Sequence, residues 1–350
     1  MTMSRRAFLR AAVGSAAALA ATDSALGRSS WPPTGQAWRP AYLQLEEEGR
    51  FEERIDQAYA ILERCRLCPR RCGVNRLVGE TGLCRTAERA VVFSAQPHFG
   101  EELPLVGDRG SGTIFFSNCN LRCVFCQNWP IAHEGRGQPL EVEALADVML
   151  QLQRIGCHNV NLVTPTHVMP QILQATRLAA QNGLRIPLCY NTGGYDALEA
   201  IELLDGVVDI YLPDLKFMDA DQAERYMGAR DYPETAQAAI EEMHRQVGEM
   251  VTNLGGIAQR GVMIRHLVMP NHVANTRAFV QWVAETLTTS TYVNIMSQYR
   301  VEHRAFEHPD IARAITTEEY LEAMDWADEA GLTNLDERSV MQRDLFRRRG

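Results

Sequence analysis

After the apolar stretch Thr113–Phe116 the chain continues as Cys119-Asn-Leu-Arg-Cys123-Val-Phe-Cys126. Three thiols on one short loop are one too few for a structural zinc ion, which takes four protein ligands. Three thiolates are enough for a cubane 4Fe–4S cluster that leaves one iron open to another molecule. Because an open iron is a place where a reaction can occur, this spacing indicates an enzyme.

Composition limits the classes of protein to which the chain can belong. It has 350 residues, of which 46% are hydrophobic and 23% charged, as in a globular protein with a sizeable core. The formal net charge is −9, and no basic stripe is visible along the sequence, which argues against nucleic-acid binding. No apolar run is long enough to span a bilayer in a mature chain.

The first 27 residues have the pattern of a removable export signal. The charged start Ser4–Arg10 is followed by an Ala-rich run over Ala11–Ala21 and by small residues at Ala25–Gly27. The paired arginines before Phe8 resemble the twin-arginine signal, which exports proteins that have already folded. We therefore expect a periplasmic or other extracytoplasmic location. The alternative is a basic N-terminal helix on a cytoplasmic protein.

A second group of cysteines precedes the first. Residues 28–62 are expected to form a linker and an N-terminal helix over Leu43–Leu62, and residues 63–110 a Cys-rich module. Its four thiols are spaced for a small knuckle around zinc or iron, with disulfides or free thiols as the alternative. These cysteines are Cys65, Cys68, Cys72 and Cys84. Cys157 and Cys189 stand alone in apolar segments, as buried small hydrophobic residues do.

From Gly112 onward, candidate strands and helices alternate. Strands are expected at Thr113–Phe116, Asn159–Val163, Ile186–Tyr190, Val207–Leu212, Val262–Met269 and Tyr292–Met296. Helices are expected at Val142–Ile155, Met169–Gln181, Asp196–Leu204, Thr235–Leu254 and Thr276–Leu287. Such alternation predicts an α/β core over residues 111–300, with parallel strands and helices outside. Periodicity alone leaves a doubly wound sheet and a partial barrel both open. Residues 301–350 form a helical extension with a helix at Thr316–Ala330.

Polar residues follow the ends of these strands. In parallel α/β folds, sites gather at the carboxyl ends of the strands. Polar or small residues occur there at Thr164–His167, Asn191–Tyr195, Asp214–Lys216 and Ser297–Arg300, and Arg265 lies within the fifth strand. We therefore expect one pocket around the three cysteines.

At this point a family resemblance is visible. The three-cysteine run, with Phe125 before its last cysteine, matches the motif of the radical S-adenosylmethionine (SAM) superfamily. The wider segment Gly112–Asn128 is similar to the pyruvate formate-lyase activating enzyme-like branch. Further similar segments are Cys65–Cys84, Asn161–His167, Tyr190–Tyr195 and Tyr211–Lys216. The resemblance covers roughly residues 60–305, and several motifs recurring in order are more specific than one motif alone.

The resemblance implies a partial (β/α)6 radical SAM barrel and a radical reaction. Cys119, Cys123 and Cys126 would hold a 4Fe–4S cluster whose open iron binds SAM. An electron from a low-potential donor would break a carbon–sulfur bond of SAM, giving methionine and a 5′-deoxyadenosyl radical. That radical takes a hydrogen atom from a substrate, a protein or a small molecule that the sequence does not identify. A glycyl-radical enzyme is the substrate from which the branch takes its name.

Further site residues follow from the same resemblance. Phe125 would pack near the adenine of SAM. Backbone at Thr164 and Thr166 takes the place of the superfamily's Gly-Gly-Glu segment, with His167 as a polar partner. Arg265 would meet the SAM carboxylate, with a structural salt bridge as the alternative. The expected partners of further SAM polar groups, or of a monovalent cation, are Asn191, Thr192 and Asp214.

Two other classes of function stay open at this stage. One is an iron–sulfur electron-transfer protein that never cleaves SAM. The other is a noncatalytic metal-binding protein that depends on the four-cysteine module. Both share the cysteines with the leading hypothesis and differ in what those cysteines do.

Overall fold

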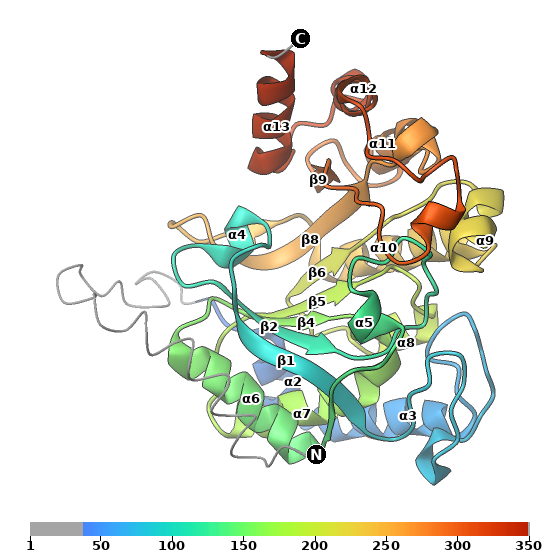
Figure 1. Ribbon diagram of the computed structural model, residues 1–350. Helices are drawn as coiled ribbons and strands as arrows, with labels where there is room; N and C mark the ends of the chain where they lie inside the picture. Colours follow the sequence, from blue (N-terminus) through green and yellow to red (C-terminus); the bar gives the residue numbers. More distant parts are fainter. Residues whose placement is uncertain (1–37, 349–350) are drawn as a thin grey trace.

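Six parallel strands form the centre of a nine-stranded sheet in the computed structural model, which describes residues 38–348. In spatial order they are β2 (Ser111–Phe116), β4 (Val160–Val163), β5 (Leu188–Thr192), β6 (Ile210–Pro213), β8 (Ala258–Leu267) and β9 (Tyr292–Met296). The spatial order of these strands is their order in the sequence. A doubly wound sheet reverses its strand order at a switch point, and this sheet does not. The fold is therefore a partial (β/α)6 barrel (Figure 1).

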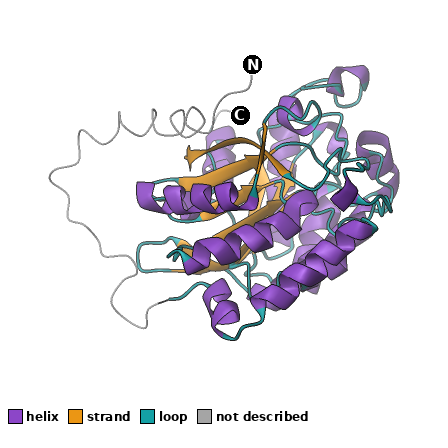
Figure 2. Ribbon diagram, turned by 90° about the horizontal axis from the view of Figure 1, so that it is seen from below, coloured by secondary structure: helices purple, strands orange, loops and turns teal. Residues whose placement is uncertain are grey.

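Helices lie along the outside of the strands, as Figure 2 shows. The connecting helices are α6 (Val142–Ile155), α7 (Met169–Gln181), α8 (Leu198–Glu202), α9 (Ala220–Met227), α10 (Tyr232–Val247) and α11 (Thr276–Thr286). In α6, residues Leu145, Met149 and Leu152 bury one face of the helix at the spacing of its turns. The helix ends where Gly156 adopts a left-handed φ of 103°. The bounds of α6 and α7 are those that the sequence predicts, whereas α9 was not expected.

The predicted helix over Leu43–Leu62 is wrong as a single element. It is two helices, α2 (Ala41–Glu47) and α3 (Phe51–Glu63). Between them Gly49 has a φ of 68°, a left-handed conformation that interrupts a right-handed helix. The apolar spacing continued across the break, and so periodicity alone did not reveal it.

The predicted helix over Thr235–Leu254 is wrong at its carboxyl end. Helix α10 stops at Val247, where Gly248 has a φ of 68°. The chain then forms β7 (Val251–Thr252), which pairs antiparallel with β8. The stop occurs because the glycine leaves the helical region of φ/ψ space.

The amino end of the barrel is closed by a segment that precedes it in sequence. Strand β1 (Ala90–His98) pairs antiparallel with β2 and also with β3 (Gln138–Leu140). It leads into the short helix α4 (Leu103–Val106), from which Leu105 is fully buried. Leu105 belongs to a small apolar cluster with Cys189, Ile210, Leu212, Ala258, Met263 and Tyr292. Because side chains alternate along a strand, this cluster lies on the inner face, opposite the main core under the helices.

The carboxyl-terminal part packs against the last strand. Helix α12 (Thr317–Glu329) begins with a capping box between Thr316 and Glu319, and α13 (Glu337–Arg347) follows it. Leu335 bridges to Val293 of β9, so this edge strand is partly covered.

A further short helix, α5 (Trp129–Ala132), follows the cysteine loop. The expected signal at residues 1–27 lies outside the described residues. Within residues 38–348, no helix has the length and apolar character needed to cross a bilayer.

Candidate functional site

The three cysteines lie on a loop at the carboxyl end of β2 that backbone hydrogen bonds hold at both ends. The Asn118 N–H donates to the carbonyl of Ile131 at 3.0 Å, and the Val124 N–H donates to the carbonyl of Tyr226 at 2.9 Å. Asn118 adopts a left-handed φ of 71°, which turns the chain out of the strand. The loop is therefore fixed against α5 on one side and α9 on the other.

The thiols of this loop are removed from water. Cys123 is buried, and Cys119 and Cys126 are partly buried. Burial raises the pKa of all three thiols, that of Cys126 to about 12, while the Lys216 ammonium acts in the opposite direction on each. Thiols in such surroundings become thiolates when a metal supplies the compensating charge.

No ready-made site for a bare metal ion is present in the part of the chain that the structure describes. There, no three side chains of His, Cys, Asp or Glu converge closely enough to hold one. The donor set fits an iron–sulfur cluster by its chemistry, because soft thiolates are the ligands that such clusters take. The buried loop at the end of β2 also supplies the dry position that a reactive cluster needs.

Asp214 and Lys216 place an ion pair beside the cysteines. Their side chains are in contact, and each is about one fifth exposed, at 21%. The Asp214 N–H donates to the carbonyl of Thr192 at 2.9 Å, which continues the pairing of β6 with β5. A side chain at Gly194 would put a Cβ 2.4 Å from the Asp214 carbonyl, so only glycine fits between the two strand ends.

Tyr232 links the same two strand ends from α10. Its buried hydroxyl lies 2.9 Å from the carbonyls of Gly193 and Asp214 and accepts from the Lys216 N–H at 2.9 Å. A hydroxyl has one proton to donate, so it serves one carbonyl at a time. This residue was not predicted from the sequence, since it begins a helix 16 residues after Lys216.

Asp196 is a buried carboxylate that sequence reasoning also missed. It is 1% exposed, and it accepts hydrogen bonds from the Tyr190 hydroxyl at 3.1 Å and the Thr192 hydroxyl at 2.5 Å. Burial raises the pKa of Asp196, against the effect of these hydrogen bonds. Thr192 in turn lies 3.1 Å from the Thr166 hydroxyl. Asp196 thus ties together two of the threonines expected at the site.

The expected residues at the end of β4 divide into two groups. Thr164 has a left-handed φ of 61°, and its N–H donates to the carbonyl of Asn191 at 2.9 Å, beside β5. His167 is buried and turns the other way, with Nε2 2.8 Å from the carbonyl of Ser117 at the start of the cysteine loop. Burial lowers the pKa of His167 to about 4, so its ring is neutral at pH 7.

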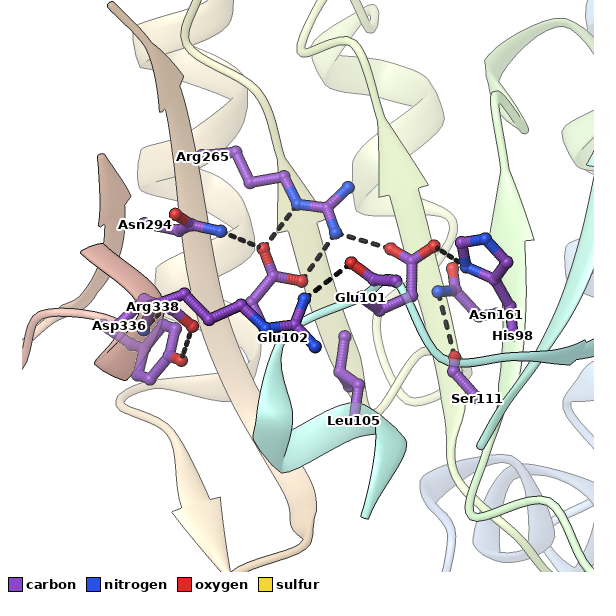
Figure 3. Close-up of polar contacts among 12 residues, drawn as sticks. His98, Glu101, Glu102, Leu105, Ser111, Asn161, Arg265, Asn294, Asp336 and Arg338 are labelled. Atoms are coloured by element: carbon purple, nitrogen blue, oxygen red, sulfur yellow. Dashed lines mark hydrogen bonds and ion pairs between the residues drawn. The ribbon is translucent and has the colours of Figure 1, made fainter. Parts of the chain in front are cut away.

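Arg265 projects from β8 toward the segment that closes the amino end of the barrel (Figure 3). Its Nε and Nη2 donate to the two carboxylate oxygens of Glu102, each at 2.6 Å, and Nη2 also donates to Glu101 at 2.5 Å. Asn294 of β9 donates to Glu102 at 2.7 Å. This is the geometry of the structural salt bridge named above as the alternative, and the contact of Arg265 with SAM stays a prediction.

Phe125 lies in an aromatic group beneath a covering segment. Its ring meets Phe217 edge-on at a centroid distance of 5.8 Å and is tilted against Tyr299 at 6.4 Å. The segment that contains Tyr299 covers the cysteine loop, since the Arg304 N–H donates to the carbonyl of Val124 at 2.8 Å. Gln127 makes a second tie, to the carbonyl of Gln298 at 3.1 Å.

The four cysteines of the Cys-rich module line one small cavity. Its other lining residues include Asn120 and His167, so the cavity borders the cysteine loop. Cys65, Cys68 and Cys84 are buried and Cys72 is exposed. All nine cysteines of the chain lie in the described part and are free thiols. The two groups of cysteines, separate in sequence, are neighbours in the fold.

The chain is similar to several known proteins over part or most of its length. Residues 113–261 match the family model described as the radical SAM superfamily. The chain is 34% identical over 300 residues to an uncharacterised protein of Methanocaldococcus jannaschii, an alignment that covers 83% of this chain and 82% of that protein. Among solved structures, HydG, a maturase of the FeFe hydrogenase, superposes with a TM-score of 0.44 and 12% identity. That superposition covers 84% of this chain and 58% of the length of HydG.

Proposed function

The chain belongs to the radical SAM superfamily, and from this premise we propose that Cys119, Cys123 and Cys126 hold a 4Fe–4S cluster that cleaves SAM reductively. The observation that carries the proposal is the place of these three cysteines. They occupy one fixed, largely buried loop at the carboxyl end of the first parallel strand of the barrel. When bound, the cluster supplies the electron that splits SAM into methionine and a 5′-deoxyadenosyl radical, which takes hydrogen from substrate.

The proposed work of the surrounding residues is to bind SAM and to exclude water. The ends of β4, β5 and β6 present Thr164, Thr166, Asn191, Thr192 and Asp214 on one rim, joined by the hydrogen bonds described above. Backbone and hydroxyl groups held in this way are suited to orient the polar parts of a cofactor. The aromatic ring of Phe125, under Tyr299, keeps water from the place where a carbon radical forms.

His167 is better suited to supporting the cysteine loop than to exchanging protons. Among the described residues, His167 Nε2 lies 2.8 Å from the Ser117 carbonyl, and Nδ1 has no hydrogen-bond partner there. With its pKa lowered to about 4 by burial, the ring stays neutral in the physiological range. We assign it the role of fixing where the loop leaves β2.

We further propose that the Cys-rich module binds its own metal, zinc or iron, through Cys65, Cys68, Cys72 and Cys84. Support comes from the four thiols that line one cavity, three of them buried, and metal binding would draw together thiols that do not converge on one point in the described structure. Four cysteines complete the ligand set of a closed structural site, in contrast to the three of the catalytic loop. The module would then stabilise the fold of the segment that packs on the cysteine loop.

Activation of a glycyl-radical enzyme is the finer proposal, and the similarity of Gly112–Asn128 and Tyr211–Lys216 to the activating-enzyme-like branch supports it. The hydrogen donor is a protein or a small molecule. The twin-arginine-like start of the chain supports export of the folded, cofactor-loaded protein, with a low-potential electron donor as the partner the reaction requires.

One assay tests the proposal. The protein is reconstituted without oxygen and mixed with dithionite and SAM, and 5′-deoxyadenosine is measured by chromatography. We expect product from the wild type and none from Cys123→Ala, while Cys157→Ala, the removal of a buried thiol elsewhere, retains activity. A reducible cluster with no product would favour an electron-transfer protein. Zinc without iron would favour a noncatalytic metal-binding protein.

A further inference from the structure

The Cys-rich module has a charge opposite to that of the whole chain. Residues 64–87 contain six arginines and a single acidic residue, Glu80, in a chain whose formal net charge is −9. These arginines are Arg64, Arg66, Arg70, Arg71, Arg76 and Arg85. The net charge of the chain hides this concentration, and the fold brings one more arginine, Arg122, next to it.

Three of these guanidinium groups surround the junction between the module and the cysteine loop. Arg70 donates to the carbonyl of Asn120 at 3.2 Å, and Arg122 donates to the carbonyl of Leu83 at 2.9 Å. Arg85 reaches the side-chain oxygen of Asn118 at 3.5 Å. The contacts therefore run in both directions, from module to loop and from loop to module.

No carboxylate neutralises these groups. All hydrogen-bond partners of Arg70, Arg85 and Arg122 are carbonyl or amide oxygens, and among residues 38–348 none of the three enters an ion pair. Arg71, beside them, is exposed and has no ion pair there, and it lines a shallow pocket whose other lining residues include Asp231 and Glu234. Elsewhere many surface arginines are paired, as Arg245 is with Asp205 and Glu242. A cluster of cations without an ion pair of its own is a surface suited to an anionic partner.

This surface also carries an exposed apolar side chain and lies against both groups of cysteines. Leu83, whose carbonyl accepts a hydrogen bond from Arg122, is 37% exposed. Leu83 and Arg85 flank Cys84, and Arg122 precedes Cys123. Cys84 lines the same cavity as Asn120, the residue that follows Cys119. A partner seated here would approach the cysteine loop through the residues that contact Arg70 and Arg122.

We propose that Arg70, Arg71, Arg85 and Arg122, with Leu83, form a docking surface for an acidic electron-transfer protein, which we call the arginine face. The proposal rests on the function proposed above. The docked carrier gives up one electron and is oxidised, and the cluster held by the cysteine loop is reduced; no bond and no proton is transferred. Basic groups around a small apolar patch give the partner its orientation and speed its association. A reductant fits this place because it needs only to bring an electron close to the cysteine loop, which Arg70 contacts and from which Arg122 projects.

The first test measures binding to the cluster-loaded protein. The probe is an acidic 2Fe–2S ferredoxin, titrated calorimetrically at low and at raised salt. We expect Arg71→Glu/Arg85→Glu to weaken binding at low salt by about tenfold or more, and raised salt to weaken wild-type binding in the same way. Arg71→Lys/Arg85→Lys keeps the charge and should bind like the wild type. Arg277→Glu, the same charge change at an exposed position on α11, is the matched control.

The second test separates docking from catalysis. With reduced ferredoxin as donor, Arg71→Glu/Arg85→Glu should form 5′-deoxyadenosine several-fold more slowly than the wild type, while with dithionite the two rates should agree. Equal ferredoxin affinities for wild type and variant would overturn the arginine face. The arginine face would also be overturned if the protein bound an acidic peptide or a single-stranded nucleic acid but not the ferredoxin. It would be overturned as well if the variant lost the same share of its rate with dithionite as with ferredoxin. Absence of product from the wild type with dithionite would overturn the proposed function instead, and the calorimetric result would still decide the docking surface.

Discussion

The Arg265 guanidinium holds the Glu102 carboxylate by two hydrogen bonds, Nε to Oε1 and Nη2 to Oε2, each 2.6 Å long. Glu102 is 1% exposed and Glu101, the second acceptor, is 6% exposed. The pair joins β8 to the segment before α4, which lies more than 160 positions earlier in the chain. A two-pronged contact of this kind fixes orientation as well as distance. This contact therefore attaches the segment before α4, which closes the amino end of the barrel, to strand β8.

Removing Arg265 should cost more stability than removing the whole network. Arg265→Met leaves two buried carboxylates without a counter-charge, which typically costs about 3–5 kcal/mol of the free energy of unfolding. Adding Glu101→Gln and Glu102→Gln to the same chain should restore most of the loss, because the uncompensated charges are then gone. Urea unfolding of the three proteins measures both steps. Equal stability of Arg265→Met and the triple variant would show that the charges are not the cause.

His266 should make the fold sensitive to mild acid. It is fully buried, with Nδ1 2.6 Å from the Leu215 carbonyl and Nε2 3.0 Å from the Thr276 hydroxyl. Burial lowers the pKa of His266 from 6.5 to about 4. The pKa of His266 is lower in the folded state than in the unfolded state. The contribution of His266 to the free energy of unfolding is therefore complete above pH 6.5 and is lost as the pH falls toward 4, by at most about 1.4 kcal/mol per pH unit.

The variant His266→Gln tests that pH dependence. Denaturant unfolding between pH 7.5 and 5 should show a smaller loss of stability for the variant than for the wild type. His308→Gln, at a partly exposed histidine, should keep the wild-type profile. Parallel pH profiles for wild type and His266→Gln would contradict the assignment.

Cys68→Ser should affect stability more than chemistry. If the four cysteines of the module share a metal, the loss of one ligand removes binding energy that is also folding energy. We expect a lower melting temperature and one metal fewer per chain, with some cleavage of SAM remaining below that temperature. Cys157→Ser, at another buried cysteine, is the comparison for the loss of a thiol without loss of metal. Unchanged melting and metal content would speak against a metal in the module.

Asp196→Asn should weaken the binding of SAM while the cluster remains. The carboxylate accepts from Tyr190 and Thr192, and an amide can reproduce only part of this pattern because one of its two heteroatoms is a donor. Residues that orient the ligands of a metal commonly change its affinity by about 10- to 100-fold, and we expect a loss of SAM affinity of this order. Equilibrium dialysis of SAM gives the affinity, and iron content verifies the cluster. Wild-type affinity in the variant would leave Asp196 with a purely structural role.

The apolar periodicity of the sequence predicted those helices and strands that have regular spacing and clearly marked ends. The bounds of α6, α7 and β9 agree with expectation, because each has a regular apolar pattern and polar residues or a glycine at its end. Strand β1 was not predicted, because it lies within the Cys-rich segment and because its pairing with β2 cannot be inferred from the order of the sequence. The choice between sheet and barrel also required spatial strand order, which periodicity does not contain.

The residues of the candidate site also divide into those that the sequence predicted and those that it did not. Cys119, Cys123, Thr192 and Asp214 belong to recognisable motifs at strand ends, and the fold gathers these ends on one edge. Glu102 gave no such signal, because its partner Arg265 is remote in sequence; two adjacent acids without a basic neighbour were the available hint. An acid directly after the Gly-Gly-Tyr turn was the corresponding hint for Asp196.

The central claim is an iron atom that the chain leaves without a cysteine ligand, so that SAM can bind it. Electron paramagnetic resonance of the reduced, anaerobically prepared protein, before and after addition of SAM, tests this claim directly. The account predicts a 4Fe–4S signal that shifts when SAM is added and that is absent from Cys123→Ala. No 4Fe–4S signal in the wild type, or a signal that SAM leaves unchanged, would contradict it.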